Sequence, residues 1–102
     1  MVGSALLAEF KRRAEAALPG RIARVVLFGS RARGDARFDS DWDLAVFLNN
    51  VPSTEDRRAL AVAAYDLILD SGQFLQPIAL PIARADEDSL FMRRIRQDGV
   101  PI

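Results

Sequence analysis

The sequence predicts an α+β protein, an α/β sandwich in which a small mixed β-sheet is flanked by helices. Two apolar runs, 22–28 and 44–48, have the length and residue types of largely buried strands. Two longer segments, 4–18 and 53–70, repeat apolar residues at helical spacing. A third extended run, 74–82, follows the second helix, so helices and strands alternate and can pack as layers.

Composition limits the classes of function that the chain can have. Half of the 102 residues are hydrophobic and the formal net charge is zero, so we expect one domain, residues 1–102, and find no direct signal for nucleic-acid binding. Cysteine and histidine are both absent, which excludes disulfides, thiolate zinc sites and an imidazole base. No apolar run is long enough to span a membrane and no signal peptide is evident, so we expect a cytoplasmic location.

The first half of the chain should form a helix and two strands. The helix 4–18 has an apolar face opposite a charged face, and a Pro-Gly pair ends it. The strand 22–28 stops at Gly29, and the strand 44–48 stops at turn-forming residues in 49–52. The two strands are therefore joined by a connection that contains most of the polar residues of this region.

The second half begins with a long helix. Ser53 or Thr54 can cap its start, acidic residues occupy its first turn, and Gly72 follows its end near Asp70. Its apolar side consists largely of leucine and alanine, which allows close packing on a sheet.

Two further elements complete the expected fold. The run 74–82 carries two prolines that cannot donate to a sheet, so this strand is an edge or is broken near Pro77. A last helix, 87–97, is expected with Asp86 as its cap and Gly99 after its end.

Two acidic residues stand at the start of the second strand. Asp41 and Asp43 are two residues apart, so on an extended backbone they share one face at a spacing of about 6 to 7 Å. Carboxylate pairs of this kind hold Mg²⁺, which assists phosphoryl displacement. Trp42 should point to the opposite face and pack beneath the strand.

The segment before this pair has the residue types of a phosphate site. Gly29 allows the backbone to approach a ligand, and Ser30 adds an N–H and a hydroxyl. Arg31, Arg33 and Arg37 add cations that can bind phosphate oxygens in a forked geometry. A nucleoside triphosphate carrying Mg²⁺ would match both halves of the stretch.

The complete string resembles the signature of the minimal nucleotidyltransferases, a family of the DNA polymerase β-like superfamily. Gly29-Ser30 is followed by ten residues, including Gly34, and then by Asp41-x-Asp43. The order of elements extends the resemblance over most of the chain, and it implies the nucleotidyltransferase fold. An acidic turn beside a basic surface patch would be the plain alternative, but it leaves the conjunction of these residues unexplained.

The resemblance implies an enzyme that transfers a nucleoside monophosphate, AMP from ATP, to an acceptor hydroxyl. It assigns catalysis and Mg²⁺ binding to Asp41 and Asp43. It assigns nucleotide binding to a second set of residues, which are Gly29, Ser30, Arg31, Arg33 and Gly34. Arg31 and Arg33 could equally be solvent-exposed, and Gly34 should also close the short turn that begins at Ser30.

Small members of the family also suggest a partner. Many pair with an all-helical HEPN toxin, act as its antitoxin and transfer AMP to a tyrosine of the toxin. We therefore expect a HEPN-type partner, with Phe74, Leu75 or the last helix as its docking surface, and a homo-oligomer remains open. The alternative is a catalytically weak binding module that neutralises a helical partner by contact. A P-loop enzyme is excluded because no Gly-Lys-Ser/Thr follows Gly29.

One departure from the family concerns the third carboxylate that its catalytic members often place on the strand after the long helix. No acidic residue occurs from 71 to 85, and Gln76 or Ile78 occupies the expected position. Asp39 or Asp70 could substitute, the partner could supply the base, or the chain could bind nucleotide without turning it over.

Overall fold

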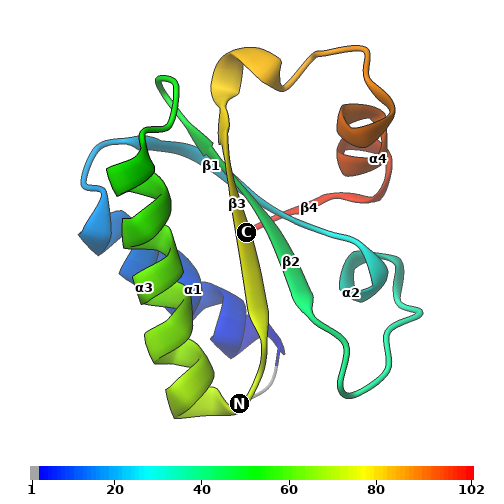
Figure 1. Cartoon of the computed structure of the whole chain (residues 1–102). Helices are drawn as coiled ribbons and strands as arrows, with labels where there is room; N and C mark the ends of the chain where they lie inside the picture. The colour runs from blue at the N-terminus through cyan, green and yellow to red at the C-terminus, as the bar shows by residue number, and fades with distance from the viewer. Residues whose placement is uncertain (1–2) are drawn as a thin grey trace.

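Residues 3–102 are described by a computed structural model in which helices cover both faces of one four-stranded sheet (Figure 1). The elements in chain order are α1 (Gly3–Ala17), β1 (Ile22–Phe28), α2 (Ser30–Arg33), β2 (Trp42–Leu48), α3 (Thr54–Ser71), β3 (Leu75–Pro81), the 3₁₀ turn η1 (Ile82–Arg84), α4 (Leu90–Asp98) and β4 (Val100–Pro101). The predicted α+β class is confirmed. Within residues 3–102, no helix is both long and apolar enough to cross a membrane.

The sheet has the strand order β3-β2-β1-β4. β1 pairs antiparallel with both β2 and β4, whereas β2 and β3 are parallel, so the sheet is mixed as expected. The prolines of β3 do place it at an edge, and its pairing with β2 continues through Pro77 without a break.

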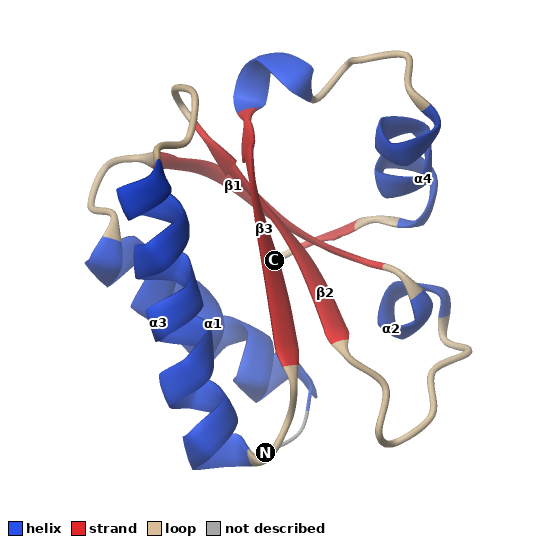
Figure 2. Cartoon of the chain, in the orientation of Figure 1, coloured by secondary structure: helices blue, strands red, loops and turns tan. Residues whose placement is uncertain are grey.

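Each face of the sheet buries its own apolar cluster. α1 and α3 pack on one face, where Leu6 and Phe10 of α1 and Leu67 of α3 meet alternate residues of β1 and β2 (Figure 2). α4 packs on the other face, where Met92 and Ile95 contact the intervening strand residues. Side chains alternate between the two faces along a strand, so residues two apart on β2 lie on the same face of the sheet. The position of each functional residue along β2 therefore determines its face.

The start of α3 is fixed by polar contacts. The Ser53 hydroxyl accepts a hydrogen bond from the Asp56 N–H, and the Asp56 carboxylate accepts one from the Ser53 N–H, which makes a reciprocal capping box. Arg21 also donates to the Asp56 carboxylate at 2.8 Å. These bonds hold the pKa of the buried Asp56 carboxyl down at about 2, and the bond from Arg21 is the largest cause.

Two details of the C-terminal region differ from the sequence prediction. α4 begins at Leu90, three residues later than expected, because the Ser89 hydroxyl and not Asp86 accepts the capping bond from the Met92 N–H. β4 was not expected, since it is only two residues long, and it pairs with Val26 and Leu27 near the end of β1.

Candidate functional site

The turn between β1 and α2 brings the backbone against an acidic side chain. Gly29 has φ 77° and ψ −158°, a conformation that is essentially restricted to glycine. A Cβ atom at this position would lie 2.4 Å from Oδ2 of Asp43. Gly29 is therefore required both by its backbone conformation and by the carboxylate that lies in direct contact with it.

The short helix α2 ends as the sequence suggested. Gly34 adopts the left-handed conformation, with φ 85°, and its N–H donates to the carbonyl oxygen of Ser30 at 3.0 Å. At the other end, the N–H groups of Ala32 and Arg33 both donate to the carbonyl oxygen of Gly29 at 3.1 Å. The turn from Gly29 to Gly34 is thus a closed unit, with Ser30 beside the acidic pair.

Asp41 and Asp43 lie on either side of the first residue of β2. Asp43 is within the strand, pairs with Phe28 of β1 and is half-buried, whereas Asp41 is exposed at the end of the preceding loop. The pKa of the Asp43 carboxyl is raised, first by burial and then by the negative charge of Asp41, while Arg33 acts in the opposite direction. The negative charge of Asp41 therefore acts on the Asp43 carboxyl.

Trp42 packs on the face of β2 opposite to Asp43, as predicted. Its ring contacts the apolar cluster between the sheet and helices α1 and α3, and its indole N–H donates to Oε1 of Gln73 at 3.1 Å. The guanidinium carbon of Arg31 lies 4.3 Å from the centre of the ring. Trp42 thus links the acidic end of β2 to the scaffold and to α2.

Arg31 also holds the loop that leads into β2. Its Nη2 atom donates to the carbonyl oxygens of Phe38 at 2.9 Å and of Ser40 at 3.1 Å. Both contacts fix the backbone immediately before Asp41. This positioning role was not apparent from the sequence, where Arg31 was considered only as a phosphate ligand or an exposed residue.

The other two arginines of the stretch differ in their surroundings. Arg33 donates to the Asp35 carboxylate at 3.2 Å and lies 3.6 Å from that of Asp98 at the end of α4. Arg37 is exposed, and its backbone N–H donates to the Ser40 hydroxyl at 2.8 Å. Of the three, Arg33 is the one whose charge acts on Asp43.

No third carboxylate joins the pair. Gln76 is the residue of β3 that pairs with Asp43 across the parallel strands, and Ile78 lies two residues further along. Asp70 is bound to Arg13 at 2.8 Å in the layer formed by α1 and α3, which removes it from consideration as a substitute. Within residues 3–102, no group of three or more acidic side chains is arranged to hold a metal ion alone.

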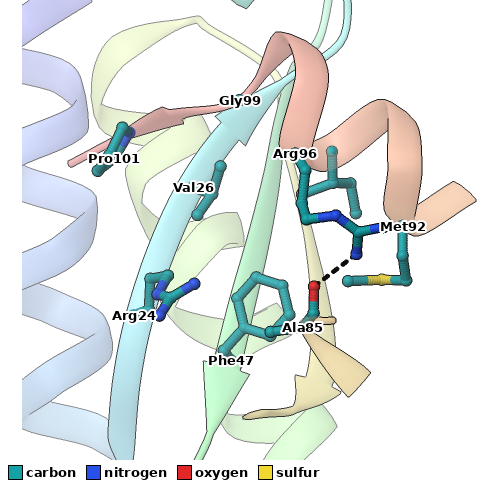
Figure 3. A pocket seen from close by; sticks show the side chains of 9 residues that line it. Arg24, Val26, Phe47, Ala85, Met92, Arg96, Gly99 and Pro101 are labelled. Atoms are coloured by element: carbon teal, nitrogen blue, oxygen red, sulfur yellow. Dashed lines mark hydrogen bonds between the residues drawn. The ribbon is translucent and has the colours of Figure 1, made fainter. Parts of the chain in front are cut away.

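Two hollows lie on the same side of the sheet as Asp43. One, of about 250 Å³, adjoins Gly29 and is closed on its other side by α4. A larger one, of about 450 Å³, lies between the sheet and α4, further from the acidic pair (Figure 3). Arg24, Phe47 and Met92 are among its lining residues, and the Arg96 guanidinium beside it donates to the carbonyl oxygen of Ala85 at 2.7 Å.

The acidic pair fits a hard divalent cation. Asp43 and Asp41 supply carboxylate oxygens, and the pKa of Asp43 is raised first by burial and then by the charge of Asp41, which Arg33 offsets only in part. Mg²⁺ is commonly held by one or two carboxylates together with water and the phosphates of a substrate. Two acids beside a glycine turn therefore suffice for a metal that is completed by its nucleotide.

The family described as "Polymerase beta, Nucleotidyltransferase" matches residues 14–102. A relative from Methanocaldococcus jannaschii, named as a protein adenylyltransferase, is 30% identical over 97 residues, which are 95% of this chain and 95% of the relative.

Solved structures have the same fold. A structure described as that of a minimal nucleotidyltransferase has a TM-score of 0.64 at 23% identity, covering 97% of this chain and 94% of that one. A Shewanella oneidensis complex of a tri-AMPylated HEPN toxin with an MNT antitoxin has a TM-score of 0.65 at 15% identity, covering 96% of this chain and 69% of that one. The Gly-Ser turn, the acidic pair, the fold and the family match agree: this chain is a nucleotidyltransferase that belongs to the polymerase β nucleotidyltransferase family.

Proposed function

We propose that the protein transfers AMP from ATP to a hydroxyl group of a HEPN-type partner and so acts as the antitoxin of a toxin–antitoxin pair. The observation that carries this proposal is the contact between Gly29 and the Asp43 carboxylate. It brings a backbone turn suited to phosphate within reach of a carboxylate suited to a metal. The M. jannaschii relative, which is named for the same activity, supports the choice of AMP.

In this proposal the residues between Gly29 and Asp43 have distinct roles. Gly29 and Ser30 bind the β- and γ-phosphates through backbone N–H groups, and Gly34 keeps their turn closed. Asp41 and Asp43 hold Mg²⁺, which when bound offsets the charge on the attacked phosphate. The acceptor oxygen forms a bond to the α-phosphorus, and the bond to the β-phosphate breaks so that pyrophosphate leaves.

Arg31 and Arg33 have different parts in this scheme. Arg31 is stacked on Trp42 and donates hydrogen bonds to loop carbonyl groups. We therefore assign it chiefly the role of positioning Asp41, and only secondarily that of contacting phosphate. Arg33 lies near enough to act on Asp43 electrostatically and remains the proposed phosphate ligand of the two.

The exposed fractions of the side chains reduce the set of candidate contacts with a partner. Leu75 is only 4% exposed, so it is part of the core and the suggestion that it docks a partner was wrong. Phe74 is 61% exposed beside it, and Leu90 at the start of α4 is 66% exposed. These two exposed apolar side chains remain the proposed contacts with a helical partner.

We expect the isolated chain to be slow. Gln76 stands beside Asp43 where a third carboxylate would lie, and an amide can neither accept the proton of the attacking hydroxyl nor balance a metal charge. The partner would then supply the base or the geometry that completes the site. If it does not, the protein is the contact-acting binding module that the sequence left as the alternative.

The decisive experiment uses ATP labelled on the α-phosphate, Mg²⁺ and, as the candidate partner, the product of the neighbouring gene. We expect label on that protein with the wild type and none with the Asp41→Asn/Asp43→Asn double variant. Asp66→Asn is the matched control, because Asp66 is exposed on α3 away from the site. Calorimetry with and without EDTA should show that the double variant loses the metal-dependent part of ATP binding.

Two outcomes would count against the proposal. Equal metal-dependent affinity in the double variant and the control would contradict the site assignment. A tight complex with the partner that carries no label at any time would favour the binding module.

A further inference from the structure

Nothing in the sequence predicts the hollow beside Gly29. Its lining residues are Phe28, Gly29, Arg33, Phe91, Arg94 and Asp98. Its volume of about 250 Å³ is below the roughly 300 to 1,000 Å³ of pockets that hold drug-sized ligands. It is therefore too small for a whole nucleotide but suits part of one.

α4 provides the outer wall of this hollow. Phe91, Arg94 and Asp98 follow one another at spacings of three and four, so they share one helix face, while Met92 and Ile95 face the sheet. The Phe91 ring meets the Phe28 ring edge to face, with centroids 5.8 Å apart. This contact fixes α4 against the end of β1, next to Gly29.

Besides Arg33, the proposed phosphate ligand, the wall of the hollow carries a second cation that no carboxylate of the described residues engages. Arg33 is engaged by the carboxylates of Asp35 and Asp98. Arg93, the neighbour of Arg94, is engaged by Asp88 at 2.6 Å on the outer side of the helix. Within residues 3–102, Arg94 has neither a hydrogen bond nor an ion pair, although it lines the hollow. Two guanidinium groups and one carboxylate give the hollow a net positive charge.

We propose that this hollow receives the terminal phosphates of the nucleotide and that Arg94 is their ligand. The inference rests on the proposed function, because a donor whose α-phosphate is held at Asp41 and Asp43 must extend its β- and γ-phosphates past Gly29. Gly29 lies against the Asp43 carboxylate and also lines the hollow. The guanidinium of Arg94 would bind phosphate oxygens there through charge-assisted hydrogen bonds.

The test compares ligands that share or lack the terminal phosphates. Binding of ATP, AMP and inorganic tripolyphosphate, all with Mg²⁺, is measured by calorimetry for the wild type, Arg94→Ala, Arg94→Lys and Arg93→Ala. Arg93→Ala is the matched control, since it removes the same side chain from the adjacent, outward-facing position. Circular dichroism establishes that each variant is folded.

We expect Arg94→Ala to weaken ATP and tripolyphosphate about tenfold to a hundredfold and to leave AMP within about twofold. Arg94→Lys should recover part of the loss, and Arg93→Ala should resemble the wild type. Equal ATP affinity in Arg94→Ala and Arg93→Ala would overturn the inference alone. So would an equal loss for ATP and AMP in Arg94→Ala. Failure of the wild type to bind ATP with Mg²⁺ would overturn both the inference and the proposed function.

Discussion

Replacing Gly29 by alanine tests the contact on which the site depends. The new Cβ atom would lie 2.4 Å from Oδ2 of Asp43, whereas non-bonded heavy atoms prefer about 3.5 Å, so the carboxylate must move by about 1 Å. Mg²⁺ requires near-ideal geometry with ligand distances of about 2.0 to 2.1 Å. A shift of this size would therefore weaken metal-dependent ATP binding even where the fold survives.

The substitution also has a backbone cost. A non-glycine residue at φ 77° and ψ −158° costs on the order of 1 to 3 kcal/mol. Taking about 2 kcal/mol, the melting temperature of a domain of this size should fall by about 8 to 16 °C. Thermal unfolding monitored by circular dichroism measures this loss, and calorimetry below the transition measures ATP affinity in the folded protein.

Gly20→Ala is a control that distinguishes the effect of backbone strain from the effect of displacing the Asp43 carboxylate. Gly20 also has a positive φ, 72°, but its Cβ would meet no atom within 4 Å and it lies far from Asp43 along the sheet. We expect this control to lose about 1 to 2 kcal/mol of stability and to keep its ATP affinity. If Gly29→Ala bound ATP with Mg²⁺ as tightly as Gly20→Ala, the reasoning about the Asp43 carboxylate would be refuted.

Two further predictions follow from polar contacts of the scaffold. Arg31→Ala should speed amide hydrogen exchange in the loop before β2, because that loop loses the three hydrogen bonds that Arg31, stacked on Trp42, donates to its carbonyl oxygens; unchanged exchange would contradict the positioning role. Asp56→Asn should destabilise the protein at pH 7. Because the folded pKa of Asp56, about 2, is below its unfolded value of about 3.9, its stabilisation is complete above about pH 5 and is lost progressively as the pH falls through about 2. Urea unfolding of the wild type and of Asp56→Asn, at pH 7 and near pH 2, measures the difference in free energy of unfolding between the two proteins. A difference that does not shrink in acid would exclude this explanation.

The sequence was sufficient for most of the fold because its signals are local. Ser53 and the acidic residues that follow it predicted the start of α3, and the prolines predicted that β3 is an edge. The start of α4 could not be predicted reliably, since Asp86 and Ser89 are both good capping residues and only the packed structure distinguishes them. β4 has no local signal, because two residues pair with β1 only after α4 has turned the chain back.

The candidate site also has features that could be predicted from the sequence and features that could not. The approach of Gly29 to Asp43 follows from a short motif between two strands, so its residues could be named in advance. The position of Arg31 over Trp42 depends on how the loop folds, and residue type alone did not indicate it. Arg94 comes from a helix more than 50 residues further along the chain, and only the packing of Phe91 on Phe28 brings it to the site.

The pairing of β2 with β3 has a consequence for how this enzyme could evolve. Gln76 and Asp43 are direct partners on parallel strands about 4.8 Å apart, so their side chains leave the sheet on the same face. Glutamine and glutamate codons differ only in their first base. A single nucleotide change would therefore place a third carboxylate beside the acidic pair, on a strand whose register is already set, and a lineage could gain or lose an intrinsic base without altering the fold.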